Sequence, residues 1–265
     1  MNQSHHEADI EIDGARLKVR MIGPFAPDKP VLVFLHEGLG SITQWRDFPE
    51  DLSAATGLSA LVYDRTGYGR SSALPQPWPD DFLLRQAHLL PHLLDRLHIT
   101  KPVLFGHSDG GTIALMVSAL YPNLPLATIT EAAHVLIEPI TKQGLQALLE
   151  KSTRDPDFAA RLLRHHPHQD ISFITNWIKT WLRPSLSEWS MVDMLGTITC
   201  PLLALQGAHD EHGSADQINL IVTRVSGPAH SVIIPDCGHV PHLEARQSVL
   251  DSVTDFLEKS DILKL

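Results

Sequence analysis

Apolar and polar residues alternate near the start of the chain and then give way to short runs that are apolar throughout. The alternation over 8–12 and 16–20, on either side of Asp13-Gly14, predicts a β-hairpin with one covered face. The apolar runs are typical of strands that a parallel sheet buries on both faces. They fall at 31–35, 58–63 and 102–106, and the segments 126–130, 202–206 and 231–235 are candidate later strands.

Segments with a helical spacing of apolar residues lie between these runs, at about 44–55, 80–97, 110–120, 214–225 and 242–259. Pro91 lies inside the second segment and is expected to kink or split that helix. Strands that alternate with helices predict an α/β fold with a doubly wound, mostly parallel sheet and right-handed crossovers.

The stretch 135–196 breaks this alternation and predicts several short helices separated by prolines. Because it lies before the last two predicted strands, we expect a helical cap over the strand ends. The predicted organisation is therefore an α/β core of residues 1–134 and 197–265, with a cap of residues 135–196.

Composition removes several classes of function. With 21 basic and 31 acidic residues the formal net charge is −10, which argues against nucleic acid or an anionic membrane as partner. No apolar run approaches the roughly 18–20 residues of a membrane span. The opening residues show no secretory signal, and the two cysteines, Cys200 and Cys237, make no disulfide framework. We expect a cytoplasmic protein that acts on a small molecule without a cofactor.

A histidine cluster, His165-His166-Pro167-His168, has residue types that bind metals. No cysteine or carboxylate partner lies nearby at ligand spacing, and Pro167 breaks any helical i, i+4 pair. We therefore expect a solvent-facing helix end at this position and no metal site.

The strongest chemical signal is the G-x-S-x-G motif of Gly106-His107-Ser108-Asp109-Gly110. A predicted buried strand ends at Gly106 and a predicted helix begins just after Ser108. Glycines on both sides permit a tight turn that holds the serine out, and the helix start directs N–H groups toward whatever the serine attacks. This context predicts a nucleophilic serine; a glycine-rich turn with an idle serine is the alternative.

The chain resembles the α/β-hydrolase superfamily over nearly its whole length. The similar segments are LHEGLGS (35–41), YDRTGYGRSS (63–72), GHSDG (106–110), QGAHD (206–210) and DCGH (236–239). The elbow and the acid segment are most similar to small-molecule serine hydrolases of the carboxylesterase or valacyclovir-hydrolase-like kind. The resemblance implies the α/β-hydrolase fold.

The family's chain order of nucleophile, acid and base implies a triad of Ser108, Asp210 and His239. Asp210 and His239 both follow predicted strands, so they lie at the carboxyl edge of the sheet, where such folds place their sites. Two neighbours compete for these roles. Glu211 adjoins Asp210, and His242 lies three residues past His239, on the helix that follows.

The resemblance also implies an oxyanion hole made by the backbone N–H groups of Gly38 and Asp109. This chain departs from the family pattern because Glu37 occupies a position where glycine is usual. We expect Trp177 and Trp181 of the cap to line an apolar pocket for the substrate.

Glu37 and Asp109 would place two carboxylates beside a site that stabilises an anion. One hypothesis is that they bind a cation on the substrate, such as an amine. The alternative is that Asp109 stabilises the N-terminus of its helix and that Glu37 pairs with Arg65 or Arg70.

The predicted activity is hydrolysis of a small-molecule ester, thioester, lactone or activated amide through an acyl-enzyme on Ser108. A carbon–carbon bond hydrolase, or a cofactor-free oxygenase or lyase that uses His239 as base, is a second possibility on this fold. Relatives that cleave carbon–carbon bonds usually carry tryptophan where Val240 stands. A non-catalytic ligand-binding relative is a third possibility, but such proteins usually lack a triad member.

Overall fold

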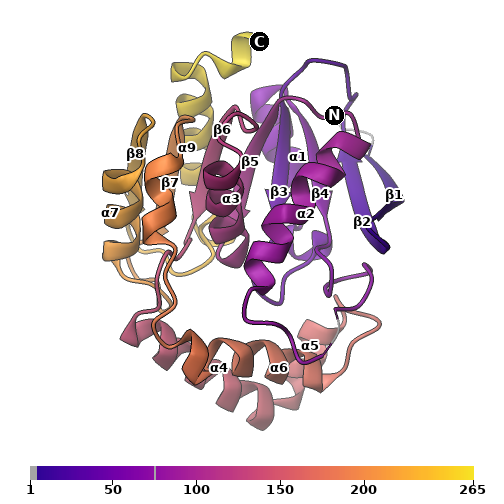
Figure 1. The fold of residues 1–265 in the computed structure, drawn as a ribbon, viewed down its shortest axis with the longest axis vertical. Coiled ribbons are helices and arrows are strands. Elements are labelled where there is room, and N and C mark those ends of the chain that lie inside the picture. Colours follow the sequence, from indigo (N-terminus) through magenta and orange to yellow (C-terminus); the bar gives the residue numbers. More distant parts are fainter. Residues whose placement is uncertain (1–4, 75) are drawn as a thin grey trace.

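Eight strands form one sheet in the part of the chain that the computed structural model describes, residues 5–74 and 76–265 (Figure 1). Residues 1–4 of the predicted core lie outside the described residues. The strand order is β1-β2-β4-β3-β5-β6-β7-β8; β2 is antiparallel to β1 and β4, and the other neighbours are parallel. The strands are β1 (His5–Ile12), β2 (Ala15–Ile22), β3 (Val31–Leu35), β4 (Ser59–Tyr63), β5 (Pro102–His107), β6 (Ala127–Glu131), β7 (Leu202–Gly207) and β8 (Ala229–Ile234).

The predicted hairpin is confirmed. Strands β1 and β2 pair in antiparallel register up to Ile12 opposite Ala15. Asp13 and Gly14 both have positive φ, 50° and 79°, which is the geometry of a two-residue turn that matches the twist of the strands.

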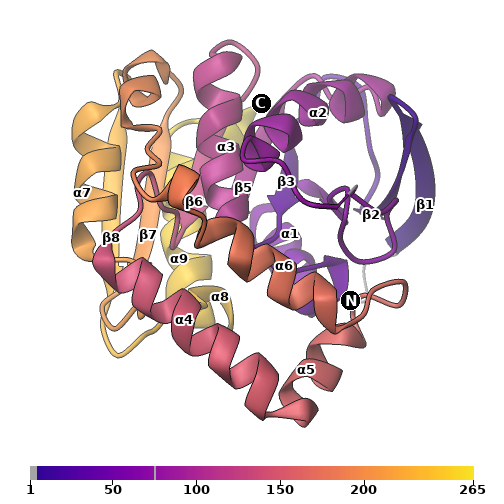
Figure 2. The ribbon, with the colours of Figure 1, turned by 60° about the horizontal axis from the view of Figure 1, so that its bottom comes forward.

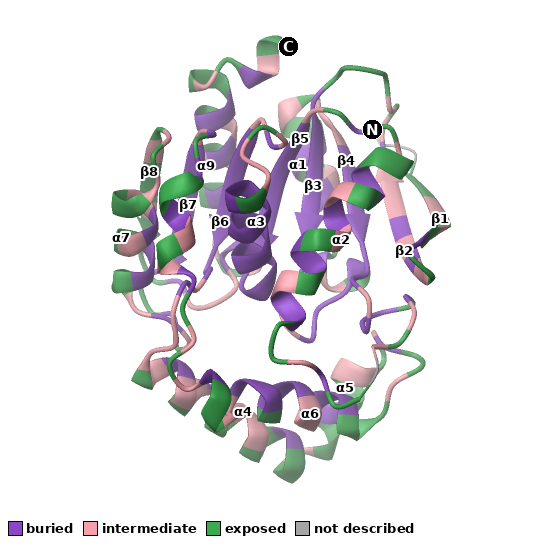
Figure 3. Cartoon of the chain, in the orientation of Figure 1, coloured by how far each residue is buried: buried purple, intermediate pink, exposed green. Residues whose placement is uncertain are grey.

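Helices cover both faces of the sheet, with α2, α3 and α7 on one face and α1 and α9 on the other (Figure 1). Neighbouring residues of β3 therefore enter different cores: Val33 packs with the first group of helices and Phe34 with the second. The central strands β3 to β7 are buried, whereas the edge strands β1 and β8 and the outer helix faces are largely exposed or half-buried (Figure 3). These helices are α1 (Phe48–Thr56), α2 (Phe82–Arg96), α3 (Asp109–Leu120), α7 (Ala215–Arg224), α8 (Pro241–Glu244) and α9 (Arg246–Lys259).

Helix α2 is continuous across Pro91, so of the two predicted effects the split is wrong, and the kink stays a prediction. Proline removes one helical hydrogen bond and costs about 3 kcal/mol in a helix interior. Leu90, Leu93 and Leu94 on either side of it are buried in the core, and their burial offsets this cost.

The predicted helix at 242–259 is in fact two helices, α8 and α9, because Ala245 leaves the helical conformation with φ −135°. The break lets the carboxylate of Glu244 accept from the amides of Gly238 (2.7 Å) and Val240 (3.0 Å). This contact fixes the loop that carries His239.

The stretch 135–196 forms three α-helices that lie across the carboxyl ends of the parallel strands (Figures 1 and 2). Its two ends meet where Leu136 pairs with Ser190 in an antiparallel bridge. The helices are α4 (Pro139–Arg154), α5 (Pro156–Leu163) and α6 (Ile171–Trp181), and short 3-10 helices lie at Ile42–Trp45, Pro184–Leu186, Val192–Thr197 and Ile262–Lys264. Of the helices in the described ranges, none has the length and apolar character needed to cross a membrane.

Candidate active site

Ser108 lies at the sharp turn between β5 and α3, with φ 52° and ψ −120°. The turn brings backbone segments so close that side chains would not fit beside it. A Cβ atom on Gly106 would lie 2.2 Å from the carbonyl oxygen of Gly110, and one on Gly110 would lie 2.0 Å from that of Leu35. The two glycines of the motif are therefore required by packing, and they hold the serine side chain at the carboxyl edge of the sheet.

The structure brings the three predicted catalytic side chains together. His239 Nε2 lies 3.0 Å from Ser108 Oγ, and His239 Nδ1 lies 2.8 Å from Asp210 Oδ1. Asp210 also accepts from the backbone N–H of His212 (2.8 Å) and from Gln206 Nε2 (2.7 Å). Burial alone would raise the pKa of Asp210, but the hydrogen bond and the charge of His239 lower it. The carboxylate therefore stays ionised and orients the ring so that Nε2 faces the serine.

The two competitors lie elsewhere. Glu211 is 65% exposed, and its carboxylate is 4.0 Å from His212 Nε2. His242 is on α8, as predicted, and its buried Nδ1 lies 2.5 Å from Glu131 Oε2. Neither side chain contacts Ser108 or His239 through a hydrogen bond in the described residues.

Gly38 and Asp109, the predicted oxyanion donors, border the same pocket as Ser108. Neither backbone N–H donates a hydrogen bond to an acceptor in the described residues. A Cβ atom on Gly38 would lie 2.1 Å from the indole ring of Trp177, so only glycine fits at this position beneath the cap.

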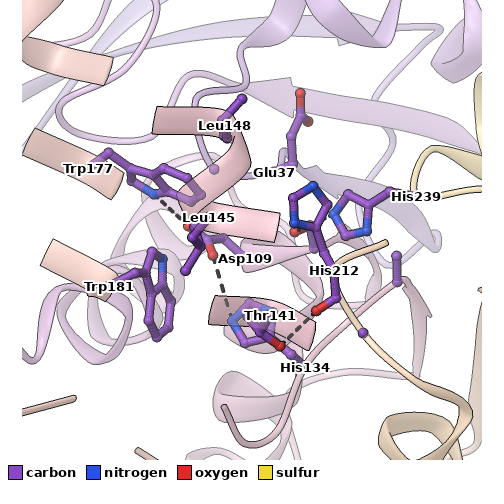
Figure 4. A pocket seen from close by; sticks show the side chains of 14 residues that line it. Glu37, Asp109, His134, Thr141, Leu145, Leu148, Trp177, Trp181, His212 and His239 are labelled. Carbon is purple, nitrogen blue, oxygen red and sulfur yellow. Dashed lines mark hydrogen bonds and ion pairs between the residues drawn. The ribbon is translucent and has the colours of Figure 1, made fainter. Parts of the chain in front are cut away.

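The pocket beside Ser108 has a volume of about 100 Å³ and lies between the core and the cap (Figure 4). Its apolar walls come from helices α4 and α6: Leu145, Leu148, Trp177 and Trp181. Its polar lining includes Asp109, Thr141, His134 and His212, and Figure 4 shows His212 beside His239. Such a pocket fits a small substrate with an apolar group.

The carboxylate of Glu37 has a different partner in the structure from the arginines that were predicted for it. Glu37 Oε2 lies 3.4 Å from His107 Nδ1, whereas Arg65 donates to the backbone carbonyl of Glu37 (2.9 Å) and Arg70 pairs with Glu7. The predicted side-chain pairing with Arg65 or Arg70 is therefore wrong. Burial alone would raise the pKa of Glu37, but the hydrogen bond and charge of His107 lower it to about 2.

Asp109 is buried in the first turn of α3 and accepts from Trp177 Nε1 at 3.0 Å. Its other oxygen lies 3.8 Å from His134 Nε2. Burial raises the pKa of Asp109 despite the opposing charge of Arg65 and the bond from Trp177. Trp177 is therefore a hydrogen-bond partner of Asp109 as well as part of the pocket wall.

Two further histidines, His134 and His212, border the pocket. Burial, together with nearby His239, lowers the pKa of both His134 and His212 to about 4, so both rings are neutral at pH 7. Each neutral ring offers one donor and one acceptor to a ligand. His212 lies two residues after Asp210 in the sequence, whereas nothing in its local sequence marks His134.

The predicted exposure of the histidine cluster is wrong for His166. Its ring is buried, accepts from the backbone N–H of Gly69 at Nδ1 (2.8 Å) and donates from Nε2 to the carbonyl of Leu39 (2.8 Å). Burial lowers the pKa of His166 to about 4. His166 therefore links the cap to the loop that carries Gly38, whereas His168 is exposed as predicted.

One group in the described residues has the spacing of a metal site. Ring nitrogens of His107 and His242 and a carboxylate oxygen of Glu131 all lie within 4.8 Å of one another, and all three side chains are buried. Their atoms already take part in hydrogen bonds with one another or with neighbouring groups. The predicted absence of a metal stays a prediction.

The fold and the grouped serine, histidine and aspartate are those of an α/β-hydrolase. A model of the alpha/beta hydrolase family matches residues 32–251, and the chain belongs to this family.

Known relatives differ in what they act on. The chain is 26% identical to the sn-1-specific diacylglycerol lipase ABHD11 of Danio rerio, over 87% of this chain and 79% of that protein. It is 34% identical to a proline iminopeptidase of Lactiplantibacillus plantarum, over 63% of this chain and 50% of that protein. The crystal structure of a bacterial membrane phospholipase A matches with a TM-score of 0.80 and 19% identity, over 97% of this chain and 86% of that one. All three names describe hydrolases, but these hydrolases do not all cleave the same kind of bond.

Proposed function

We propose that the protein is a serine hydrolase that cleaves a small-molecule ester through an acyl-enzyme on Ser108. The observation that carries the proposal is the continuous hydrogen-bonded path from Ser108 Oγ through His239 (3.0 Å) to Asp210 (2.8 Å). A serine hydroxyl becomes a nucleophile when a positioned base accepts its proton, and the base needs a group that fixes its tautomer.

Each residue then has one role in the reaction. Ser108 Oγ attacks the carbonyl carbon while His239 Nε2 accepts the hydroxyl proton. The N–H groups of Gly38 and Asp109 stabilise the oxyanion, an effect of roughly 3 kcal/mol for each well-placed donor. His239 returns the proton to the departing alcohol oxygen and then removes one from a water molecule, which attacks the acyl carbon. The bond from the acyl carbon to Ser108 Oγ breaks, His239 returns the second proton to Oγ, and the acid leaves. Asp210 accepts from His239 Nδ1 throughout.

The substrate class follows from the pocket. Apolar walls that include Trp177 and Trp181 suit a short apolar acyl or alcohol group, and a volume of about 100 Å³ favours a small one. Thioesters, lactones and activated amides are compatible with the same chemistry. The carboxylesterase or valacyclovir-hydrolase-like kind is the subtype that we propose, and a cytoplasmic location remains part of the proposal.

A fluorophosphonate probe tests this function directly. We expect one adduct by intact mass, mapped to Ser108, together with turnover of short-chain aryl esters. Ser108→Ala is expected to abolish labelling and lower kcat by about 10⁴-fold or more, with an unchanged melting temperature. Ser248→Ala, a change at an exposed serine of α9, is the matched control and keeps full activity.

The outcomes separate the alternatives. Absence of an adduct together with absence of ester turnover would point to a ligand-binding relative. If the Ser108→Ala variant still cleaves a carbon–carbon bond, or still abstracts a proton from a substrate, the chemistry belongs to His239 alone. That result would overturn the acyl-enzyme.

A further inference from the structure

His107 is the residue before the nucleophile, and the mechanism above does not use it. It ends β5, and its side chain is 1% exposed. The ring lies behind the proposed triad, with its centroid 5.3 Å from that of His239 and 5.0 Å from that of His242. A buried titratable ring in this position needs a physical account.

Both nitrogens of the His107 ring face atoms that can only accept a hydrogen bond. Nε2 lies 2.8 Å from the backbone carbonyl oxygen of His239, and Nδ1 lies 3.4 Å from Glu37 Oε2. A neutral imidazole has one donor and one acceptor nitrogen, whereas an imidazolium has two donors. The surroundings of His107 therefore match the charged ring.

The charged groups around His107 favour the same form. Glu37 lies on one side and Glu131, its partner in the β5–β6 register, on the other. Glu131 Oε2 is bonded to His242, while its Oε1 has no hydrogen-bond partner in the described residues. Burial alone would lower the pKa of His107, but the bond to Glu37 and the charges of Glu131 and Glu37 raise it to about 9.

We propose that His107, as an imidazolium, is a positioning residue that ties the backbone of the catalytic base to the nucleophile turn and to the oxyanion loop. Its own backbone precedes Ser108, its Nε2 holds the carbonyl of His239, and its Nδ1 holds the side chain of Glu37, next to Gly38. One buried cation thus connects the three loops that supply the site. The inference rests on the proposed function, because it assigns His107 a role in placing that triad.

The protonation of His107 can be measured directly. In protein labelled with ¹⁵N-histidine, the His107 resonances are assigned by their loss in His107→Gln. We expect both ring nitrogens to carry hydrogen at pH 7–8 and to lose one proton only near pH 9. A neutral ring at pH 7 would overturn the proposal, whatever the folding of the variants.

Kinetics test the positioning role. With p-nitrophenyl acetate, His107→Ala is expected to lower kcat by about 10- to 100-fold, because a displaced catalytic group costs this much, while KM changes little. The rate of fluorophosphonate labelling on Ser108 is expected to fall in parallel. His88→Gln, at an exposed histidine bonded to Tyr121, is the matched control and leaves both rates unchanged.

The pH profile separates positioning from a general loss of structure. In the wild-type protein kcat is expected to fall above pH 9, where His107 loses its charge. Glu37→Gln removes the group that contributes most to raising the pKa of His107. The fall of kcat at high pH is therefore expected to begin at a lower pH in this variant. A fall that begins at the same pH as in the wild type would contradict the proposal.

Three further outcomes are distinguishable. If the wild-type protein is not labelled on Ser108, the proposed function fails before His107 is tested. If labelling is normal in the wild type and equally fast in folded His107→Ala, only the present inference fails. One equivalent of bound zinc whose removal by a chelator lowers activity would also overturn it, because a metal would need a free lone pair on His107.

Discussion

At the scale of the residue, Ser108 holds a backbone conformation that few side chains adopt. Its φ of 52° lies in a region that costs roughly 1–3 kcal/mol for a residue other than glycine. The N–H of Ser108 donates to the backbone carbonyl of Glu131 (2.8 Å), and the N–H of Thr112 donates to the backbone carbonyl of Ser108 (3.0 Å). These bonds hold the turn. The strain is thus offset by backbone contacts, which leaves the hydroxyl free for His239.

Asp210→Asn tests the acid. We expect kcat to fall by about 10⁴-fold, because an asparagine can donate to Nδ1 and so favour the wrong tautomer of His239. Glu211→Gln is the matched control and is expected to change kcat by less than about twofold. A larger loss in Glu211→Gln than in Asp210→Asn would place the acid one residue later.

Asp109→Asn decides between the two interpretations of the pocket carboxylates. Because Asp109 already accepts from Trp177 Nε1 and burial raises its pKa, we expect it to orient the indole and not to bind a substrate cation. The measurement is kcat/KM for an α-amino ester and for its counterpart without the amine. Equal losses are expected; a loss confined to the amino ester would support cation binding.

At the scale of the element, the core strands were predictable because burial on both faces makes them continuously apolar. The candidate triad came from the resemblance to the family, whose chain order of nucleophile, acid and base places Asp210 and His239 just after β7 and β8. The continuous α2, the break at Ala245 and the burial of His166 were not predictable, because each depends on contacts with residues distant in sequence. The same holds for His134 in the pocket and for the pairing of Glu37 with His107.

His166→Ala tests the link between cap and core. The change leaves the N–H of Gly69 and the carbonyl of Leu39 without their partner, and each buried unpaired group costs about 1–3 kcal/mol. We expect the free energy of unfolding to fall by about 2–5 kcal/mol in urea titrations. His168→Ala, two residues away and exposed, is expected to change it by less than about 0.5 kcal/mol; similar effects of the two changes would contradict the link.

At the scale of the whole molecule, buried histidines make stability depend on pH in two opposite directions. The pKa values of His134, His166 and His212 are lowered to about 4, so their stabilising contribution is present above pH 6.5 and is lost as the pH falls toward 4. The pKa of His107 is raised to about 9, so its contribution is complete below pH 6.5 and is lost as the pH rises through 9.

We therefore expect the free energy of unfolding to be largest near pH 6.5. Each histidine changes it by at most about 1.4 kcal/mol per pH unit. Because burial lowers the pKa of His36 and His165 as well, five histidines act on the acid side and one, His107, acts on the basic side, so the acid side is steeper. Urea titrations between pH 4.5 and 9.5 measure this profile. His107→Gln is expected to flatten the basic side alone, and a profile without a maximum would contradict the assignment.

The meeting of the cap's two ends at Leu136 and Ser190 makes the cap an exchangeable cassette. A segment that leaves and re-enters a domain at one place can be replaced by a shorter or longer one without altering the path of the chain through the sheet. The cassette is not fully independent, because its side chains hydrogen-bond the core at several places. Trp177 and His166 contact Asp109, Leu39 and Gly69, and Glu138, Thr141 and Arg183 bond to further core residues. A transplanted cap must therefore bring equivalents of these contacts, and chimaeras that cross over at this junction are expected to inherit their selectivity from the donor of the cap.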